Sequence, residues 1–138
     1  MGFKTKTALV IAFAVAALAA GELPPETQAK FIKILASSAG SAGKVVCNNG
    51  ALAGELGKVG VSPDPGSKVA WASSEAEVKS LKGAGKLVIC GKLEWLSAGG
   101  SIAVVEEGGK PQIYLNMGNI AASGVTLSDA VLKIGKKL

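Results

Sequence analysis

The chain has 138 residues, a formal net charge of +5 and a hydrophobic content of 49%. All its positive charges are lysines and aromatic residues make up only 4%, so the sequence lacks the arginine forks and stacking rings that nucleic-acid recognition favours. Histidine is absent and there are two cysteines, which excludes His-based nucleophilic systems and the usual zinc sites. We therefore expect no enzyme, catalytic residue, metal or cofactor, and no nucleic-acid partner.

The first predicted element is a secretory signal peptide at residues 1–19. Lys4 and Lys6 precede an apolar run, and the run ends in the small-residue cleavage pattern Ala-Leu-Ala at residues 17–19. This run is too short to cross a bilayer, which disfavours a retained membrane anchor. Lysines only at its front disfavour a helix of the folded core. We therefore expect a periplasmic protein that folds where thiols can oxidise.

Residues 20–43 are predicted to form an N-terminal helix and a connector. Pro24 and Pro25 followed by Glu26 are typical of a helix start, since proline suits the first turn and an acid faces the helix dipole. The small residues at 37–43 end this helix and join it to the first strand.

Residues 44–138 are predicted to form one α/β domain that begins with three apolar strands, at 44–47, 68–71 and 86–90. A helix at 51–58 follows the first strand. A second helix follows Ser74, which together with Glu77 forms a capping-box pattern. Alternating strands and helices of these lengths imply a parallel sheet with right-handed crossovers.

The pattern changes after residue 100. Residues 101–105 and 112–116 flank a glycine-rich turn and predict an antiparallel hairpin. A short helical turn at 118–123 and a last helix at 129–138 follow, the latter with lysines near its carboxyl end that oppose the helix dipole. The predicted fold is an α/β three-layer sandwich of about five strands, with a mostly parallel sheet and a C-terminal antiparallel hairpin.

Cys47 and Cys90 both fall at the carboxyl ends of predicted parallel strands. In a flavodoxin-like order the first and third strands are neighbours, about 4.8 Å apart, which allows a disulfide bond. Two cysteines in an exported chain are more often paired than free. Two alternatives stay open: both cysteines are small buried hydrophobes, or a strained bridge between them acts as a redox switch.

The loops after these strands lie where open α/β sheets place ligands. Their residues Asn48, Asn49, Gly50 and Gly91 could hold a small anion on backbone amides, although Asn-Asn-Gly is also ordinary turn chemistry. Trp95, beside Glu94, is a candidate for the rim of a pocket. Trp71 and Trp95 are alternatively plugs of the hydrophobic core.

Several segments together resemble the YfiR/HmsC family. The C-terminal part carries the resemblance, through Gly-Gly-Ser-Ile-Ala-Val-Val at 99–105, Ile-Tyr-Leu-Asn at 113–116, and the segments 121–128 and 131–134. Upstream, residues 31–33, 44–50 and 86–91 fit the family's opening helix, its Cys-x-x-Gly first strand and a later apolar strand. The chain lacks the family's second cysteine pair, and its strand between the third and fourth is shortened to residues 93–96.

The resemblance implies a periplasmic, non-enzymatic regulator that binds the extracytoplasmic part of a membrane signalling protein, such as a diguanylate cyclase or sensor kinase. It also implies a disulfide-bonded, redox-responsive protein. Asn116, which ends the Ile-Tyr-Leu-Asn strand, joins the loop residues above as a candidate ligand- or partner-binding residue. The alternative function is a periplasmic small-ligand binding protein.

Overall fold

The structure is a computed structural model that describes residues 21–138, so the predicted signal peptide at 1–19 lies outside the described residues. The elements follow one another along the chain with these bounds: α2 (Pro25–Ser38), β1 (Lys44–Val45), α3 (Gly50–Lys58), β2 (Ser62–Pro63), β3 (Val69–Ala72), α4 (Glu75–Gly83), β4 (Leu87–Cys90), the 3-10 helix η1 (Leu93–Leu96), β5 (Ile102–Glu107), β6 (Lys110–Leu115), α5 (Met117–Ser123), α6 (Asp129–Ile134) and β7 (Lys136–Lys137).

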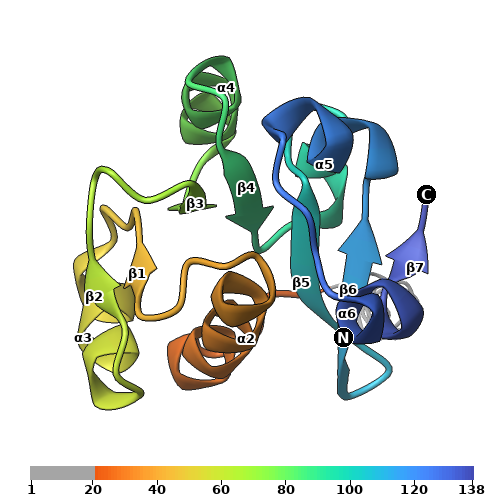
Figure 1. The fold of residues 1–138 in the computed structure, drawn as a ribbon. Coiled ribbons are helices and arrows are strands. Elements are labelled where there is room, and N and C mark those ends of the chain that lie inside the picture. The colour runs from red at the N-terminus through yellow and green to blue at the C-terminus, as the bar shows by residue number, and fades with distance from the viewer. Residues whose placement is uncertain (1–20) are drawn as a thin grey trace, which may run out of the picture.

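The main sheet has the strand order β3-β4-β5-β6-β7 (Figure 1). Strands β3, β4 and β5 are parallel, β6 returns antiparallel to β5, and β7 lies parallel to β6. The short parallel pair β1–β2 joins this sheet through an isolated bridge between Val46 and Ala70. The predicted mostly parallel sheet with a C-terminal antiparallel hairpin is confirmed.

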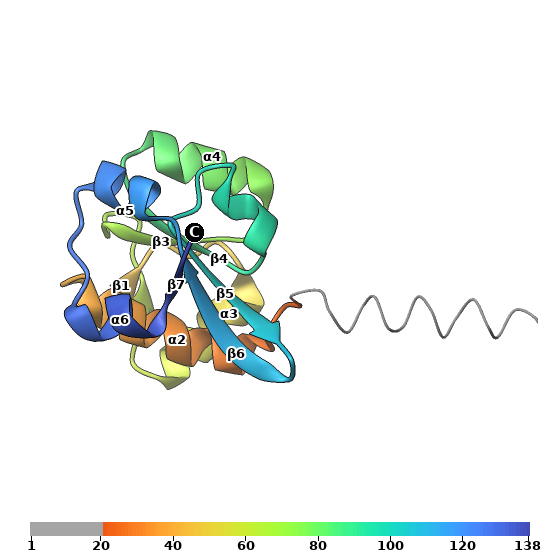
Figure 2. The ribbon, with the colours of Figure 1, turned by 90° about the vertical axis from the view of Figure 1, so that its right-hand side faces the viewer.

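Helices cover both faces of the sheet, which gives the predicted three layers (Figure 2). Helices α2, α3 and α6 lie on one face, and α4 lies on the other. Strand β4 is buried on both faces: Leu87 and Ile89 belong to the larger core cluster with α2 and α3, whereas Val88 and Cys90 pack toward α4 and η1. This alternation explains why its sequence is apolar without a break.

The predicted cap at Ser74 forms, and Asn49, which the sequence indicated only as part of a turn, caps a second helix. The Asn49 side chain accepts a hydrogen bond of 3.0 Å from Leu52 N and begins α3, and Ser74 Oγ accepts one of 3.1 Å from Glu77 N at the start of α4. The hairpin turn has positive φ at both Gly108 and Gly109, 61° and 80°, which matches the twist of the paired strands.

The strand order differs from the flavodoxin-like prediction. The first and third predicted strands, now β1 and β4, are not neighbours, because β3 lies between them. The predicted shortened strand at 93–96 is instead the 3-10 helix η1.

The last predicted helix is also shorter than expected. Helix α6 ends at Ile134, Gly135 is extended, and Lys136–Lys137 forms β7 along the open edge of β6. Leu138 N donates to Leu115 O at 3.0 Å, so the edge of β6 offers backbone hydrogen bonds that compete with continued helix. Lys136 and Lys137 therefore do not oppose the helix dipole.

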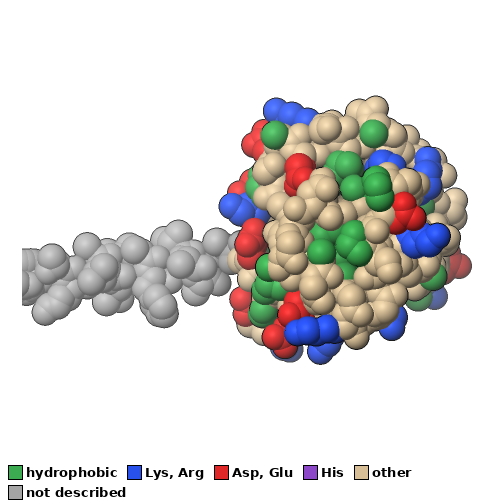
Figure 3. Space-filling model, turned by 90° about the vertical axis from the view of Figure 1, so that its left-hand side faces the viewer, with side chains coloured by type: hydrophobic (Ala, Val, Ile, Leu, Met, Phe, Trp, Pro, Cys, Tyr) green, Lys and Arg blue, Asp and Glu red, His purple; other side chains and the backbone are tan. Residues whose placement is uncertain are grey.

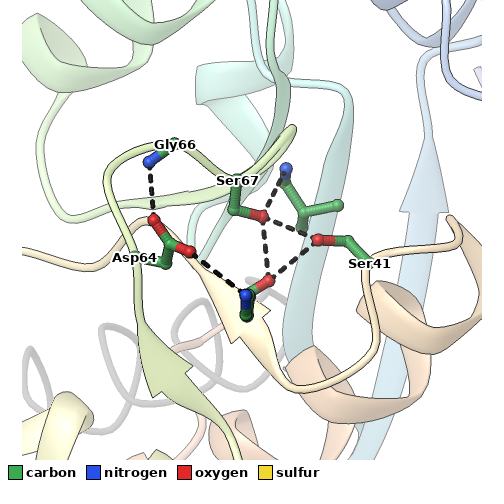
Figure 4. Close-up of polar contacts among 6 residues, drawn as sticks. Ser41, Asp64, Gly66 and Ser67 are labelled. Atoms are coloured by element: carbon green, nitrogen blue, oxygen red, sulfur yellow. Dashed lines mark hydrogen bonds and ion pairs between the residues drawn. The ribbon is translucent and has the colours of Figure 1, made fainter.

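A cluster of polar groups fixes the connector after α2 (Figure 4). The hydroxyls of Ser41 and Ser67 both donate to Lys44 O, at 3.0 and 2.8 Å, and the two hydroxyl oxygens lie 2.8 Å apart. Val69 N donates to Ser67 Oγ, and Asp64 Oδ1 accepts from Gly66 N at 2.8 Å. The groups in this cluster satisfy one another, so we assign it a structural role.

The face that carries α3 and β2 has mixed chemistry (Figure 3). Acidic and basic side chains are interspersed there around small groups of hydrophobic atoms. That face therefore presents neither a continuous apolar surface nor a field of one sign.

Candidate functional site

A cavity of about 150 Å³ opens at the carboxyl edge of β1, β3 and β4. Open α/β sheets place ligands at this edge, because the loops that follow neighbouring strands converge there. The loop after each strand supplies a residue, β3 itself supplies two, and α2 with the segment before it supplies the other two. The lining residues are Glu22, Gln28, Asn49, Trp71, Ala72, Ser73 and Trp95.

Ser73 is the centre of a hydrogen-bond network in the cavity wall. Its Oγ accepts from Trp71 Nε1 at 3.0 Å and from Asn49 Nδ2 at 3.3 Å. Because both lone pairs of the hydroxyl oxygen are then in use, its own proton is left to donate. The wall thus presents an oriented O–H donor.

Glu77 holds the loop that carries Ser73. Its Oε1 accepts from Ser73 N at 2.7 Å, and its Oε2 accepts from Asn48 Nδ2 at 3.2 Å. The carboxylate therefore links the loop after β1 to the loop after β3 and fixes the geometry of the cavity wall.

Gln28 is the least expected member of the lining. The residue is only 7% exposed and lines the cavity, and its side-chain amide forms no hydrogen bond with another residue of 21–138. Since no fully buried side-chain nitrogen or oxygen of the described part lacks a partner, the amide atoms must reach the surface of the cavity. Buried side-chain amides nearly always have a partner, either in the protein or in ordered solvent. The amide of Gln28 is therefore a polar group that faces the cavity and is available to an occupant.

Gly91 leaves the space on which this geometry depends. A Cβ atom at position 91 would lie 3.2 Å from Gln28 Nε2, 3.3 Å from Trp71 Cη2 and 3.6 Å from Glu22 Oε2. A side chain here would crowd Gln28 and Trp71 and would touch Glu22, so glycine leaves space at this corner of the cavity.

The charged groups at the cavity are few. Glu22 contributes a carboxylate on an exposed residue of the segment before α2. Lys92 Nζ lies 5.4 Å from the centroid of the Trp95 ring, a cation–π contact beside the cavity.

The structure brings together some of the predicted site residues. Asn49 and Trp95 line the cavity and Gly91 borders it. Asn48 does not line it, because its amide is bound to Glu77, and Gly50 begins α3 outside the lining.

Asn116 lies elsewhere and has a structural role. Its Oδ1 accepts from Asn119 N at 3.0 Å as the cap of α5, and its Nδ2 donates to Leu96 O at 3.2 Å. The side chain holds α5 against the end of η1, and the residue is not among those that line the cavity.

Sequence reasoning missed Glu22, Gln28 and Ser73 as site residues. Ser73 follows the carboxyl end of β3 and could have been found by the rule that selected Asn49 and Gly91. Glu22 and Gln28 precede the first strand, and no spacing in the sequence marks them.

The structure separates the two cysteines. Both lie in its described part and are free thiols, and β3 places their strands two spacings apart, roughly 10 Å. Cys47 packs against the core cluster of α2 and α3, whereas Cys90 belongs to the cluster of α4 and η1, on the opposite face. A disulfide needs Cα atoms within about 7 Å and side chains directed at each other, so this strand order does not allow the predicted bond.

Burial also makes both thiols poor nucleophiles. Desolvation raises the pKa of Cys90 to about 12, and a backbone hydrogen bond at Lys92 opposes this rise only in part. Desolvation likewise raises the pKa of the half-buried Cys47. A high thiol pKa leaves little thiolate at neutral pH, and the thiolate is the reactive form.

Two kinds of feature are absent from the described part of the chain. Among residues 21–138, no group of three or more Asp, Glu, Cys or His side chains is placed to hold a metal ion. No helix within the same range is long and apolar enough to span a membrane.

Comparison with known proteins places the fold in context. No family model and no curated protein matches the chain. Among solved structures, a conserved domain protein from Vibrio cholerae is similar with a TM-score of 0.63 and 14% identity, over 83% of this chain and 60% of that chain. The ABC domain in complex with L-Trp from Streptococcus pneumoniae has a TM-score of 0.56 and 13% identity, over 83% of this chain and 61% of its own.

The chain therefore spans about 60% of the length of the first of these neighbours and 61% of the second. At 14% and 13% identity the likeness concerns the fold alone. What these comparisons establish is that the chain has an α/β fold already known among solved bacterial structures.

Proposed function

We propose that this chain is an exported, non-enzymatic binding protein that holds a small ligand in the cavity between Trp71 and Trp95. The observation that carries the proposal is the side-chain amide of the largely buried Gln28, which reaches the surface of the cavity and has no hydrogen-bond partner among the described residues. A polar group kept in this state gains a partner when a ligand enters, which favours binding.

The size of the cavity limits the ligand. A volume of about 150 Å³ is what an engineered benzene-binding cavity offers, and it is below the usual range for drug-sized ligands. The ligand is therefore a molecule of a few non-hydrogen atoms, or one end of a larger one. A fold neighbour in complex with L-Trp supports a small-molecule role for this architecture.

The lining favours binding over turnover. Among the described residues, Glu22 is the one carboxylate of the lining. Within the same range, Ser73 Oγ is hydrogen-bonded to the N–H groups of Asn49 and Trp71, and the nearby Glu77 carboxylate is bonded to Ser73 N and not to the hydroxyl. Acid–base and nucleophilic catalysis both need a second group placed to exchange a proton.

The chain carries its own reporters for a binding experiment. Its two tryptophans are Trp71 and Trp95, and both line the cavity. We would screen the protein lacking residues 1–19 against amino acids, amines, organic acids and nucleotides by thermal shift. Hits would then be followed through tryptophan fluorescence and the two indole N–H signals in ¹⁵N NMR. A ligand of the cavity raises the melting temperature and moves both indole signals.

Two alanine variants separate the cavity from the rest of the fold. Gly91→Ala places a Cβ against Gln28 and Trp71 and is expected to weaken binding, whereas Gly57→Ala has nothing within 4 Å and should leave it unchanged. Failure of the whole screen to move either indole signal, or equal binding by Gly91→Ala, would contradict the proposal.

A second candidate rests on the resemblance to the YfiR/HmsC family: a periplasmic regulator that binds the extracytoplasmic part of a membrane signalling protein. The resemblance extends over nearly all of the chain after residue 30 and supports this role. Crosslinking in intact cells followed by capture from detergent-solubilised envelopes would identify such a partner. Recovery of the unprocessed chain from the cytosol would contradict both candidates, since both require export.

A further inference from the structure

We infer that the cavity selects ligands that carry a primary ammonium group, bound beside Glu22 and Gln28. This inference rests on the proposed binding function and names the ligand chemistry of that same site. Glu22 is the charged residue of the lining, and its charge is negative. A cation gains from this carboxylate, whereas an anion in the same place is repelled.

A carboxylate oxygen of Glu22 and the side-chain amide of Gln28 lie at one corner of the cavity. Measured from the position that a Cβ of Gly91 would occupy, Gln28 Nε2 lies at 3.2 Å and Glu22 Oε2 at 3.6 Å. The Gln28 amide has no partner among the described residues, so it is free to turn and present its oxygen. An ammonium group has three N–H donors and can bond both oxygens at once.

Aromatic rings form the remaining walls of this corner. Trp71 Cη2 lies 3.3 Å from the same point, and Trp95 lines the cavity as well. Tryptophan is the aromatic side chain that attracts cations most strongly. The contact of Lys92 Nζ with Trp95 at 5.4 Å is an ammonium–indole pair already formed by this protein beside the cavity.

The ammonium group could belong to a simple amine or to an amino acid. In an amino acid, the carboxylate would need a donor or a positive charge, and Ser73 Oγ–H in the lining and Lys92 Nζ beside Trp95 are the candidates. Three ligands with nearly the same carbon skeleton distinguish these sources. Isobutylamine carries the amine alone, L-valine carries both groups, and isovalerate carries the carboxylate alone; all are small enough for about 150 Å³.

The experiment titrates the three ligands separately into the protein lacking residues 1–19 and follows the indole N–H signals of Trp71 and Trp95. Isobutylamine and L-valine are expected to move both signals, and isovalerate is not. Tighter binding of L-valine than of isobutylamine identifies an amino acid as the source, and the reverse order identifies a simple amine. Either order supports the inference.

Matched variants test the charge. Glu22→Gln keeps the shape of the side chain and removes its charge, and it should weaken amine binding severalfold, a moderate loss because solvent screens an exposed carboxylate. Glu26→Gln removes a carboxylate from the first turn of α2, outside the lining, and should have no effect. Both residues are exposed, so neither variant should perturb folding.

The inference is overturned if isovalerate binds as tightly as isobutylamine, if Glu22→Gln leaves the affinity unchanged, or if none of the three ligands moves an indole signal. The binding function itself fails only if the wider screen also finds no ligand. An anion or a neutral molecule that moves both indole signals would therefore remove the ammonium inference and keep the binding function.

Discussion

The indole Nε1–H of Trp71 donates a hydrogen bond of 3.0 Å to Ser73 Oγ, two residues further along the chain. Residues two apart lie on the same side of a strand, so the contact continues the line of β3 into the loop beyond it. It ties a side chain that is 4% exposed to the wall of the cavity. The position of Trp71, and with it the shape of the cavity, therefore depends on a serine hydroxyl.

Replacing Ser73 should test this dependence. Ser73→Ala removes the acceptor of both Trp71 Nε1 and Asn49 Nδ2. We expect a loss of about 1 kcal/mol in the free energy of unfolding, at the lower end for unpaired buried donors because solvent in the cavity can replace the hydroxyl. Urea unfolding measures the loss, and the Trp71 indole signal should move. Ser80→Ala, on the exposed side of α4, should cost nothing; equal stability of the two variants would contradict the network.

The two thiols should differ in reactivity. At pH 8, iodoacetamide should modify the half-buried Cys47 slowly and leave Cys90 unmodified, because burial raises the pKa of Cys90 to about 12. Both should react after unfolding in guanidinium chloride. Intact mass with and without reductant provides the check. Labelling of native Cys90 at the rate of Cys47 would contradict its burial. A mass two units lower without reductant would contradict the separation of the two cysteines by β3.

Stability should depend on pH through Glu107 and Tyr114. The Tyr114 hydroxyl donates to the Glu107 carboxylate at 2.7 Å, which lowers the pKa of Glu107 below 4.5 and raises that of Tyr114 above 10; Lys136 contributes less to the Glu107 shift. The contact is therefore fully present above the ordinary carboxyl pKa and is lost as pH falls through the lowered one. On the alkaline side it is present below pH 10 and is lost as Tyr114 ionises.

Tyr114→Phe should bring the pKa of Glu107 back toward 4.5, and Lys136→Met should move it less. Titration of the side-chain carboxyl carbon by ¹³C NMR gives both values. A larger change in Lys136→Met would mean that the ammonium, and not the phenol, controls the carboxylate.

Two glycines should respond to alanine with opposite signs. At Gly135 a Cβ would lie 2.6 Å from Leu115 Cγ, so Gly135→Ala should push β7 from β6 and cost about 1–3 kcal/mol. Gly54, inside α3, has nothing within 4 Å, and Gly54→Ala should stabilise by about 0.5–1 kcal/mol because alanine is the better helix former. Chemical unfolding of both variants measures the difference, and a Gly135→Ala protein as stable as the unchanged chain would argue against the pairing of β7.

Features encoded by neighbouring residues were predictable from the sequence. The caps at Asn49 and Ser74 and the Gly108–Gly109 turn each depend on a few adjacent side chains, and all three form. The order of the strands depends on how whole elements pack, and nothing in the run at 44–47 specifies its neighbour. The apolar residues at the end of the chain keep a helical spacing as far as Ile134. No local pattern there indicates that Lys136 and Lys137 pair with the open edge of β6.

The candidate site was likewise predictable only in part. Asn49, Gly91 and Trp95 follow strands, so the rule on carboxyl ends selects them. Gln28 shares its polar character with other residues of α2, and its burial beside Gly91 results from how that helix packs across the sheet. Asn116 also ends a strand, but β6 is antiparallel to β4 and β5, so its carboxyl end points away from the cavity.

The bridge between Val46 and Ala70 attaches the β1–β2 pair to the main sheet through bonds from Val46 N to Val69 O and from Trp71 N to Val46 O. This bridge is the seam between the β1–β2 pair and the main sheet. Asn49 follows the seam in the loop after β1, and Ser73 follows it in the loop after β3. Backbone amides at the seam should exchange with deuterium sooner than those of β4 and β5 in the sheet interior. An occupant that spans Asn49 and Ser73 would slow that exchange, so the seam would register binding as a gain in rigidity without any change of fold.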